Sequence, residues 1–595
     1  MSRYFTVGGI RHVLLIAIVA CAFSLIIASS AKDRFGNLSI VSEEDPCSRP
    51  MIGSEVSEPK NLRSINGVLD VDLTIRNSVS SDGSMHYCYV TRDGSQSPTL
   101  RVSPGDLLIL HLTNKLVSSS TADAQKSLAG DFLSGPICTT KKRSADPCSS
   151  GVMTGLSTNL HFHGLTVPPV CHQDDVLNTS IQPSDAPFEY RFRIPDDEAP
   201  GLYWYHPHVH GFSSAQVQGG ASGALIVEGL ERANPVTAGL PERVFVIRDQ
   251  KVATPELQPT GPAVALPRIR LDRDGDVANN GTGSGLPARD LSINFVPVPY
   301  PNYPPASILT KPNERQLWRV LNASAITYID LQIVYGGEAQ QLGVVAIDGA
   351  AINGNRPGAP RVSNFNHLLV PPGARAEFIV TGPALGVTGM FVSRAVDTGP
   401  GGENDPDRPL AAIHSDENAA EPTSILPVTA SQLPAPKNPW IGDVAPTRTR
   451  KLYFSETVQD PSNPNSPTVF YMTVEGQTPT VFNPNATIPN ITVTQGDVED
   501  WIIENRTNEL HDFHIHQTHF QLVEWSGSLV NESFLRDTVN VPYFNGTTQE
   551  FPSVRLRMDF RDENSVGTFV YHCHLLEHED GGMMGTIRVV PRDRG

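Results

Sequence analysis

Four His-x-His pairs are the densest source of metal-binding side chains in this 595-residue chain. Each pair has a strand-like context, and side chains alternate faces along a strand, so each pair projects both imidazoles to one side. A lone pair would favour a hydrogen-bonded surface site, but four pairs indicate one shared metal centre. Imidazole suits copper, zinc, iron and nickel, so the pairs alone do not identify the metal. The eight residues are His161, His163, His206, His208, His514, His516, His572 and His574.

Cys573 narrows the choice of metal. It stands between His572 and His574, so it points to the opposite face of the same strand. A thiolate, two imidazoles and a weak thioether form the blue-copper electron-transfer set. A buried structural thiol is the alternative, but a free thiol between two ligands would be open to metal and oxidation. An electron could pass from the sulfur through a few backbone bonds to either neighbouring histidine. The remaining members of the set would be His511, His578 and Met583.

An internal repeat predicts the architecture. Gly201 to His208 matches Gly567 to His574, and Gly389 to Arg394 is a middle copy without histidines. A second repeat, at 100–114 and 491–505, places Gly-Asp between alternating apolar runs, which is typical of a hairpin. Three copies predict an all-β chain of three similar β-sandwich domains, with a metal-free spacer in the middle. The expected boundaries are 55–230, 240–430 and 445–595.

Charge and the first residues indicate where the protein works. The formal net charge of −18 argues against nucleic acid as a partner, because phosphates need a basic surface. Residues 1–31 form an export segment, with Arg3 and Arg11 before an uncharged run from Val13 to Ala31. This segment is either a cleaved signal peptide, a membrane anchor through residues 13–31, or a lipidation signal at Cys21. We therefore expect a secreted, periplasmic or otherwise extracytoplasmic protein.

Five cysteines remain after the leader and Cys573 are set aside: Cys47, Cys88, Cys138, Cys148 and Cys171. An exported compartment permits disulfides, although an odd count forbids pairing all five. Cys138 and Cys148 stand in one polar loop and are predicted to pair.

The motifs, taken in order, resemble those of the multicopper oxidases. His-x-His-Gly stands at 161–164, His-x-His at 206–208, His-x-x-His-x-His at 511–516, and His-Cys-His-x-x-x-His-x-x-x-x-Met at 572–583. The resemblance implies three consecutive cupredoxin-like Greek-key β-sandwich domains and four copper ions. It also implies a small-molecule or metal-ion reductant, oxidised one electron at a time, and O2 as the acceptor that is reduced to water.

The resemblance also assigns the ligands. His511, Cys573, His578 and Met583 correspond to the type 1 site, and His161 and His514 to the type 2 site. The two type 3 ions would take His163, His206, His208, His516, His572 and His574. Asp512 replaces a usual proline, and Gln517-Thr518 replaces a frequent Gly-His, but neither position is a ligand. A methionine as axial ligand implies a low-to-middling type 1 potential.

Carboxylates are expected near the cluster, since reducing O2 to water consumes four protons in a buried site. Glu579 resembles the proton-relay acid of the family. Asp174 or Asp175 is a second candidate, and a solvated acidic loop is the alternative for that pair.

The reductant is open between two classes. A laccase-like enzyme for phenols or aromatic amines requires an open approach to His511 or His578, the ligands expected nearest the surface. A metal-ion oxidase for Cu(I), Fe(II) or Mn(II) is the rival. Only nine methionines weaken the Cu(I) variant, while iron or manganese would need carboxylates near the same histidines. A copper carrier without turnover would need only the type 1 set.

Overall fold

The computed structural model describes residues 45–80, 83–118, 146–149, 153–252, 281–354, 359–428, 437–460, 462, 466–530 and 532–592. The expected leader at 1–31 and Cys138 lie outside the described residues. No helix in the described part of the chain is long and apolar enough to span a membrane.

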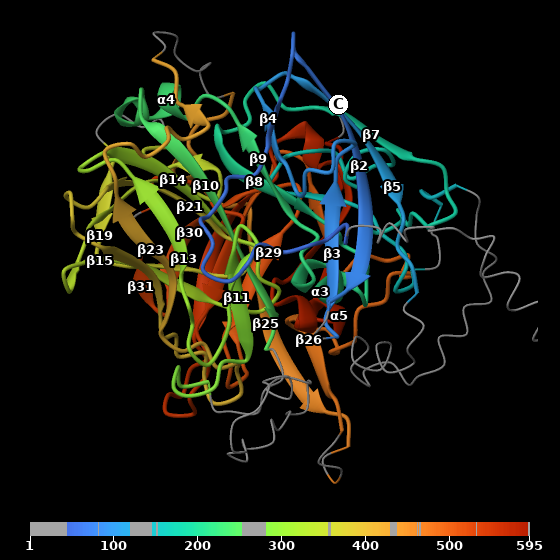
Figure 1. The fold of residues 1–595 in the computed structure, drawn as a ribbon. Coiled ribbons are helices and arrows are strands. Elements are labelled where there is room, and N and C mark those ends of the chain that lie inside the picture. Colours follow the sequence, from blue (N-terminus) through green and yellow to red (C-terminus); the bar gives the residue numbers. More distant parts are fainter. Residues whose placement is uncertain are drawn as a thin grey trace, which may run out of the picture. The chain divides into compact units, whose positions relative to one another are not determined.

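The strands of the described chain form six β-sheets, which follow one another along the sequence in three pairs (Figure 1). The N-terminal sheet pair has one sheet made of β1 (Asn61–Arg63), β4 (Thr99–Val102), β9 (Gly223–Val227), β8 (Gly201–His206) and β6 (His161–His163). Its second sheet contains β3 (Met85–Val90), β2 (Val68–Val79), β5 (Leu107–Asn114) and β7 (Phe188–Arg193).

The middle sheet pair spans residues 241–425. Its larger sheet orders β12 (Val296–Val298), β11 (Arg289–Ile293), β10 (Pro241–Lys251), β14 (Arg315–Asn322), β21 (Arg375–Thr381), β17 (Leu342–Ile347) and β18 (Ala350–Ala351), joined at the side by β19 (Ser363–Phe365) and β24 (Ser424–Ile425). The smaller sheet contains β13 (Ala306–Thr310), β23 (Arg408–Ser415), β22 (Gly389–Arg394), β15 (Ile329–Tyr335), β16 (Glu338–Ala339) and β20 (Leu368–Val370).

The C-terminal sheet pair spans residues 448–590. One sheet orders β26 (Thr468–Val474), β25 (Arg448–Val458), β28 (Val498–Asn505), β33 (Ser553–Asp559), β30 (Phe520–Trp525) and β31 (Ser528–Leu529). The other orders β27 (Ile491–Thr494), β35 (Met584–Val590), β34 (Gly567–Cys573), β29 (His511–Ile515) and β32 (Thr538–Val541). The described helices are short: α3 (Ser213–Gln218), α4 (Leu230–Ala233), α5 (Leu576–Asp580) and three 3-10 turns at Pro235–Thr237, Ile441–Asp443 and Glu563–Ser565.

Alternation of side chains explains why these segments form layered sheets. Along β2, nearly every second residue from Leu69 to Asn77 is buried and the residues between are more exposed, so one face packs inward. A large apolar cluster fills each sheet pair, and the three clusters include Leu73, Trp318 and Trp501 respectively. The expected all-β sandwich class is confirmed.

The Gly-Asp segments form strands as expected, but the expected hairpins are wrong. β4 and β5 flank the turn at Gly105 and belong to different sheets, as do β27 and β28 around Gly496. Each turn is closed by a backbone hydrogen bond, from Asp106 N to Ser103 O at 3.0 Å and from Asp497 N to Thr494 O at 3.0 Å. The four strands already have partners on other strands, so the turn carries the chain from one layer of the sandwich to the other.

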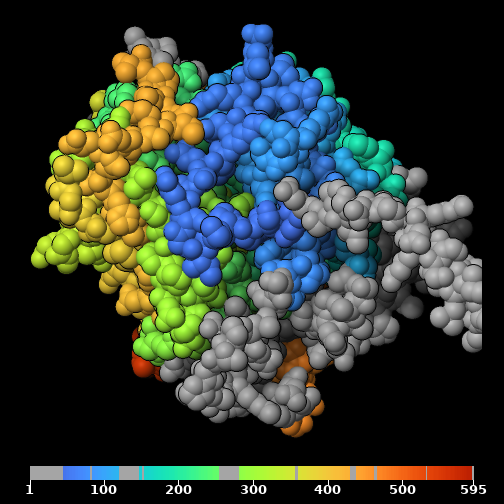
Figure 2. All heavy atoms as spheres, in the orientation of Figure 1, coloured from blue at the N-terminus to red at the C-terminus, as the bar shows by residue number. Residues whose placement is uncertain are grey.

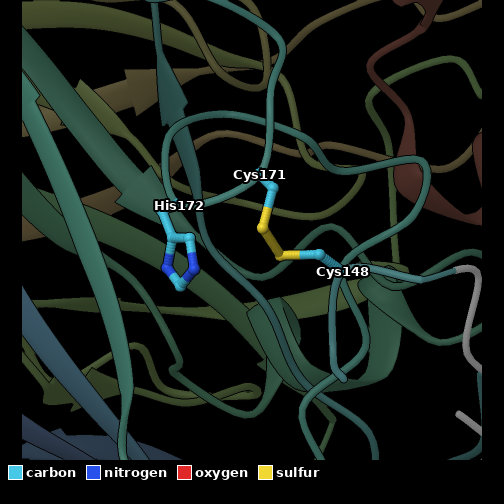
Figure 3. Close-up of side chains that lie close together, drawn as sticks. All are labelled: Cys148, Cys171 and His172. Atoms are coloured by element: carbon cyan, nitrogen blue, oxygen red, sulfur yellow. A yellow bond between two sulfur atoms is a disulfide. The ribbon is translucent and has the colours of Figure 1, made fainter. Parts of the chain in front are cut away.

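The disulfide expectation is also wrong. Cys148 pairs with Cys171, with 5.6 Å between their Cα atoms (Figure 3). The backbone explains this partner, because Ser180 N donates to Pro147 O at 2.9 Å and so holds the segment at 146–149 beside the one at 171–181. His172 lies next to this pair, but the two sulfurs are bonded to each other and offer no thiolate to a metal.

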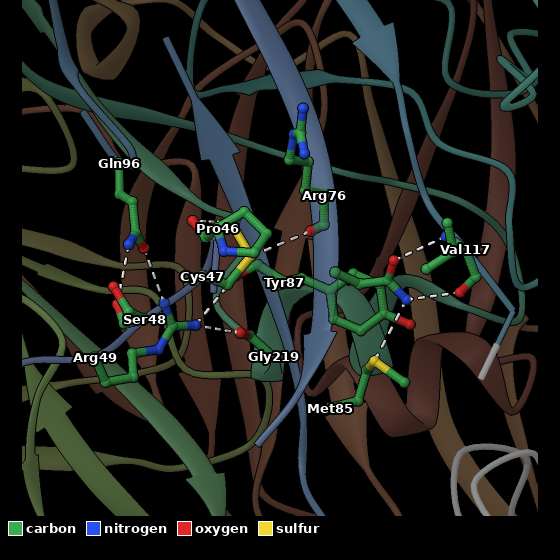
Figure 4. Close-up of a disulfide and its surroundings, with 12 residues drawn as sticks. Pro46, Cys47, Ser48, Arg49, Arg76, Met85, Tyr87, Gln96, Val117 and Gly219 are labelled. Atoms are coloured by element: carbon green, nitrogen blue, oxygen red, sulfur yellow. Dashed lines mark hydrogen bonds between the residues drawn. A yellow bond between two sulfur atoms is a disulfide. The ribbon is translucent and has the colours of Figure 1, made fainter. Parts of the chain in front are cut away.

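A second disulfide joins Cys47 to Cys88 on β3, with 5.4 Å between their Cα atoms. Beside it, Arg49 donates to Tyr87 O at 3.1 Å and to Gly219 O at 2.7 Å (Figure 4). The segment that follows pairs with the middle sheets, since Val56 N donates to Ser307 O at 2.8 Å. Figure 2 shows this N-terminal stretch, in blue, on the surface against green residues of the middle part.

Candidate metal centre

Strand register brings the histidine pairs together. In the N-terminal sheet pair, His161 on β6 lies opposite His206 on β8. In the C-terminal sheet pair, His514 on β29 lies opposite His572 on β34. The two halves then meet, because the ring of His161 stacks on His516 with 3.7 Å between centroids. All eight predicted cluster histidines therefore converge on one buried place.

Three groups of potential ligand atoms lie within this place. The first is His161, His163 and His514, the second is His163, His206 and His574, and the third is His208, His516 and His572, with ligand atoms within 4.8 Å of one another in each group. In the third group, His572 Nε2 lies 3.3 Å from His208 Nε2 and 3.2 Å from His516 Nε2. Each group takes members from both the N-terminal and the C-terminal sheet pair.

Burial and unused nitrogens show that these residues fit metal ions. The eight side chains are at most 3% exposed. Burial lowers the pKa of every one of them, for example that of His206 to about 3 and that of His572 to about 4, so the rings are neutral and carry a lone pair.

Four of the rings have one nitrogen held and the other without a hydrogen-bond partner among the described residues. His161 Nδ1 lies 3.0 Å from Asp174, His163 Nε2 lies 3.1 Å from Asp537, and His206 Nδ1 lies 3.0 Å from Pro207 O. His514 Nδ1 lies 2.8 Å from Asp537 O. The opposite nitrogens, His161 Nε2, His163 Nδ1, His206 Nε2 and His514 Nε2, are buried without partners. Buried polar atoms normally find a partner, and metal-binding histidines are typically oriented through their second nitrogen.

A separate group of three ligands contains sulfur. Cys573 Sγ lies 3.5 Å from His511 Nδ1 and 3.9 Å from His578 Nδ1, and the two Nδ1 atoms are 3.2 Å apart. Cys573 is the free cysteine of the described chain, and burial raises the pKa of its thiol in the absence of metal. A soft sulfur with two imidazoles suits copper better than a hard cation.

Met583 closes the loop that carries this group. It is fully buried, its carbonyl accepts from Cys573 N at 3.1 Å, and its N–H donates to His578 O at 2.8 Å. The backbone therefore fixes Met583 directly beside two of the three ligands.

Neither His511 nor His578 offers the open approach that a laccase-like enzyme would require, and the expectation that they lie near the surface is wrong. Their exposed fractions are 0% and 1%. The ring of Phe470, on β26, stacks on His578 with 4.2 Å between centroids, and Phe454, on β25, lies 4.8 Å from His511. Aromatic side chains of the neighbouring sheet thus cover the imidazoles that sequence reasoning placed near the surface.

The three candidate acids are placed differently. Asp174 is buried against His161 and also accepts from Phe162 N at 2.9 Å. Asp175 turns away and accepts from the side-chain amide of Asn178 at 2.9 Å. Glu579 is buried within 3.6 Å of His208 Nε2 and 3.5 Å of His572 Nδ1. Burial raises the pKa of Asp174 and of Glu579, so both are suited to holding a proton beside the cluster.

Sequence reasoning missed other residues around both groups. Asp537 contacts His163 and His514 and is itself bound by Arg375, from the middle sheet pair. Glu509 Oε1 lies 3.8 Å from His511 Nε2 and 3.6 Å from His578 Nε2. None of these residues belongs to a recognisable motif. The one sequence signal for Glu509 is its position two residues before His511.

The all-β sandwiches are of the cupredoxin type, and the mixed sulfur and imidazole side chains are typical of a copper site. Two family models described as multicopper oxidase match residues 154–232 and 461–593, which hold all the predicted ligands. This chain belongs to the multicopper oxidase family. Members of that family are copper oxidoreductases that use O2 and a reducing substrate.

Relatives and solved structures agree with this assignment. The multicopper oxidase mco of Staphylococcus aureus is 23% identical over 440 residues, covering 73% of this chain and 77% of that protein. The crystal structure of the McoA multicopper oxidase of Aquifex aeolicus aligns with a TM-score of 0.61 at 19% identity, covering 90% of this chain and 99% of that one. A multicopper oxidase of Campylobacter jejuni, described as a metallo-oxidase, aligns with a TM-score of 0.59 at 24% identity, covering 92% and 97%.

Proposed function

We propose that this protein oxidises a reducing substrate one electron at a time at a type 1 copper and reduces O2 to water at a trinuclear copper cluster. Four copper ions would be bound per chain. The observation that carries the proposal is the position of Cys573. Its sulfur belongs to the group with His511 and His578, while its neighbours His572 and His574 belong to the histidine cluster. The two groups are thus joined by adjacent residues of one strand.

The ligand assignment follows the groups. His511, Cys573 and His578 would hold the type 1 ion, with Met583 as the axial ligand. His161 and His514 would hold the type 2 ion. The type 3 ions would be held by His163, His206 and His574 on one side and by His208, His516 and His572 on the other.

Copper bound at these residues supplies one-electron redox chemistry and the site at which O2 is reduced. The protein supplies the rest. The buried cluster excludes bulk water, so the four protons must come through side chains. Glu579, hydrogen-bonded to Ser213 Oγ at 3.1 Å, and Asp174 would each hold a proton against a cluster imidazole. Cys573 and its two neighbours provide the short covalent connection between the groups.

The test is O2 consumption by the purified, copper-loaded chain. We expect a blue protein with about four copper ions per chain that consumes one O2 for every four electrons taken from the substrate. Cys573→Ser is the control: it should fold, lose the blue colour and stop consuming O2. A wild-type chain that binds copper without consuming O2 would instead be a copper carrier.

For the reductant, the covered type 1 group favours a metal ion over a phenol or aromatic amine. Glu509 Oε1 lies 3.8 Å from His511 Nε2 and 3.6 Å from His578 Nε2, and the Glu509 side chain hydrogen-bonds to Glu456, which is partly exposed on β25. Burial raises the pKa of Glu456, although its hydrogen bond with Glu509 acts in the opposite direction, so the Glu456 carboxyl favours its protonated form when no cation is present. A cation arriving at the pair would displace that proton and sit next to a type 1 histidine.

Oxygen ligands suit Fe(II) and Mn(II) better than Cu(I), which prefers soft thioethers. The description of the Campylobacter jejuni relative as a metallo-oxidase supports the same class. The laccase-like function remains the second candidate, because it needs the same copper sites and the same O2 chemistry.

Oxidation rates measured with Fe(II), Mn(II), Cu(I) and phenols distinguish a metal-ion oxidase from a laccase-like enzyme. We expect Glu509→Gln and Glu456→Gln to lower kcat/KM for the preferred metal ion about tenfold or more, roughly 1.4 kcal/mol in the transition state. Glu524→Gln, which removes a carboxylate on β30 that pairs with Arg555, is the matched control and should change nothing. Phenol oxidation that exceeds metal oxidation and ignores both variants would favour the laccase-like enzyme.

A further inference from the structure

Arg375 ties all three sheet pairs together beside the histidine cluster. It is the first residue of β21, in the middle sheet pair, and its side chain is completely buried. Its two terminal nitrogens donate to the two carboxylate oxygens of Asp537, each at 2.6 Å, in the C-terminal part. Its Nε donates to the carbonyl of Leu202, in the N-terminal sheet pair, at 3.0 Å.

Asp537 in turn contacts two cluster histidines, one through its side chain and one through its backbone carbonyl. Its carboxylate lies 3.1 Å from His163 Nε2, and its backbone carbonyl lies 2.8 Å from His514 Nδ1. The two rings are stacked, with 3.9 Å between centroids. Because Asp537 occupies these two nitrogens, His163 Nδ1 and His514 Nε2 are the atoms left facing the cluster.

Strand β21 also binds the backbone of β8, the strand that ends at His206. Glu377 stands two residues after Arg375 and therefore on the same face of β21. It accepts from Leu202 N at 2.8 Å, so both backbone groups of Leu202 are bound by β21. Leu202 belongs to β8, which ends at His206.

Two glycines make this close packing possible. A Cβ at Gly164, which follows His163, would lie 2.5 Å from Arg375 Nη2 and 2.6 Å from Asp537 Oδ2. A Cβ at Gly373, two residues before Arg375, would lie 2.7 Å from the ring of His574. Side chains at either position would displace the arginine, the aspartate or a histidine.

We propose that Arg375 is a positioning residue for the trinuclear copper cluster, acting through Asp537 on His163 and His514. The middle sheet pair therefore does more than separate the two copper-binding parts: it supplies the group that sets their geometry. This inference rests on the proposed copper function. The planar guanidinium matches two carboxylate oxygens and a carbonyl at once, which a lysine ammonium cannot do.

Arg375→Lys tests the proposal because it keeps the positive charge and removes the planar guanidinium that binds both carboxylate oxygens of Asp537. The matched control is Arg101→Lys, which removes an equally buried guanidinium paired with Glu242 and Glu228 and without a contact to the histidines among the described residues. We expect Arg375→Lys to keep the blue type 1 absorption. Its trinuclear copper should be about 10- to 100-fold more weakly bound in chelator competition, and its type 2 EPR signal altered or absent. Arg101→Lys should keep both signals and full copper affinity.

Asp537→Asn is the second variant, and it tests the link between Arg375 and the cluster if Arg375→Lys does not fold. It preserves the shape and the acceptor for His163 but removes the charge that Arg375 binds, so the type 2 signal should change in the same way. The inference is overturned if the variants that fold match Arg101→Lys in copper affinity and EPR spectrum. A wild-type chain that shows neither copper signal would count against the proposed function instead.

Discussion

Glu579 lies where a proton would be needed and where bulk water does not reach. Its carboxyl group is fully buried between the cluster histidines and Ser213, and burial raises its pKa. We expect Glu579→Gln to slow reoxidation of the reduced enzyme by O2 about 100-fold, a typical contribution of a positioned proton donor, while type 1 reduction is unchanged. Stopped-flow measurement of the two half-reactions checks this, and equal loss in both would contradict the role.

Glu198 makes stability depend on pH without contacting the cluster. It accepts from Thr166 N at 2.9 Å, and burial raises the pKa of its carboxyl to about 8. The folded state therefore keeps a proton that the unfolded state has already lost above the ordinary glutamate pKa. This group's contribution is fully present below about pH 4 and is lost as pH rises to 8, by at most about 1.4 kcal/mol per pH unit.

Glu198→Gln should remove that dependence. The variant's free energy of unfolding, from urea titrations at pH 6 and pH 8.5, should fall less over this interval than that of the wild type. Parallel losses in the two proteins would show that Glu198 ionises normally.

The histidines and the cysteine that the structure brings together could be found in the sequence, because strand parity and motif spacing are local features of the chain. Asp537 and Arg375 could not, because they reach the cluster from 162 positions apart with no shared motif. The burial of His511 was also missed, because Phe454 and Phe470 cover the histidines only once β25 and β26 have folded over them.

The Cys148–Cys171 disulfide links the segment at 146–149 to the loop that carries Asp174. Removing both sulfurs with Cys148→Ala and Cys171→Ala should lower the free energy of unfolding by about 3 kcal/mol, the chain-entropy value for a loop of this size. Urea unfolding of the two proteins without reductant measures it, because the Cys47–Cys88 disulfide then stays closed in both. An unchanged unfolding curve for the double variant would mean that the loop is held by its hydrogen bonds alone.

The strands themselves were predictable, while their pairing was not. Alternating apolar residues mark β4, β5, β27 and β28 in the sequence. Whether a Gly-Asp turn pairs its two strands or sends them to opposite layers depends on which distant strands occupy their edges, as β9 does for β4 and β7 does for β5. The disulfide error has the same origin, because Cys171 is distant from Cys148 in sequence and adjacent only in the folded backbone.

At the scale of the whole molecule, copper should couple the stability of separate parts. The histidine groups draw on both the N-terminal and the C-terminal sheet pair, and a ligand that binds only the folded state stabilises it by about 2.7 kcal/mol at a free concentration of 100 Kd. We expect the copper-free protein to unfold at lower temperature and in more than one calorimetric transition, and the loaded protein to unfold later and more cooperatively. Identical calorimetric traces would show that the parts are joined without the metal.

The division of the ligands between the two ends also constrains how the protein is made. A ribosome releases His161 to His208 more than 300 positions before His511 to His574. A nascent or prematurely stopped chain therefore exposes half of a metal site that cannot close. The proposed copper cluster can therefore be completed only after synthesis is finished, and a truncated product keeps imidazoles that can bind ions without forming a complete catalytic site.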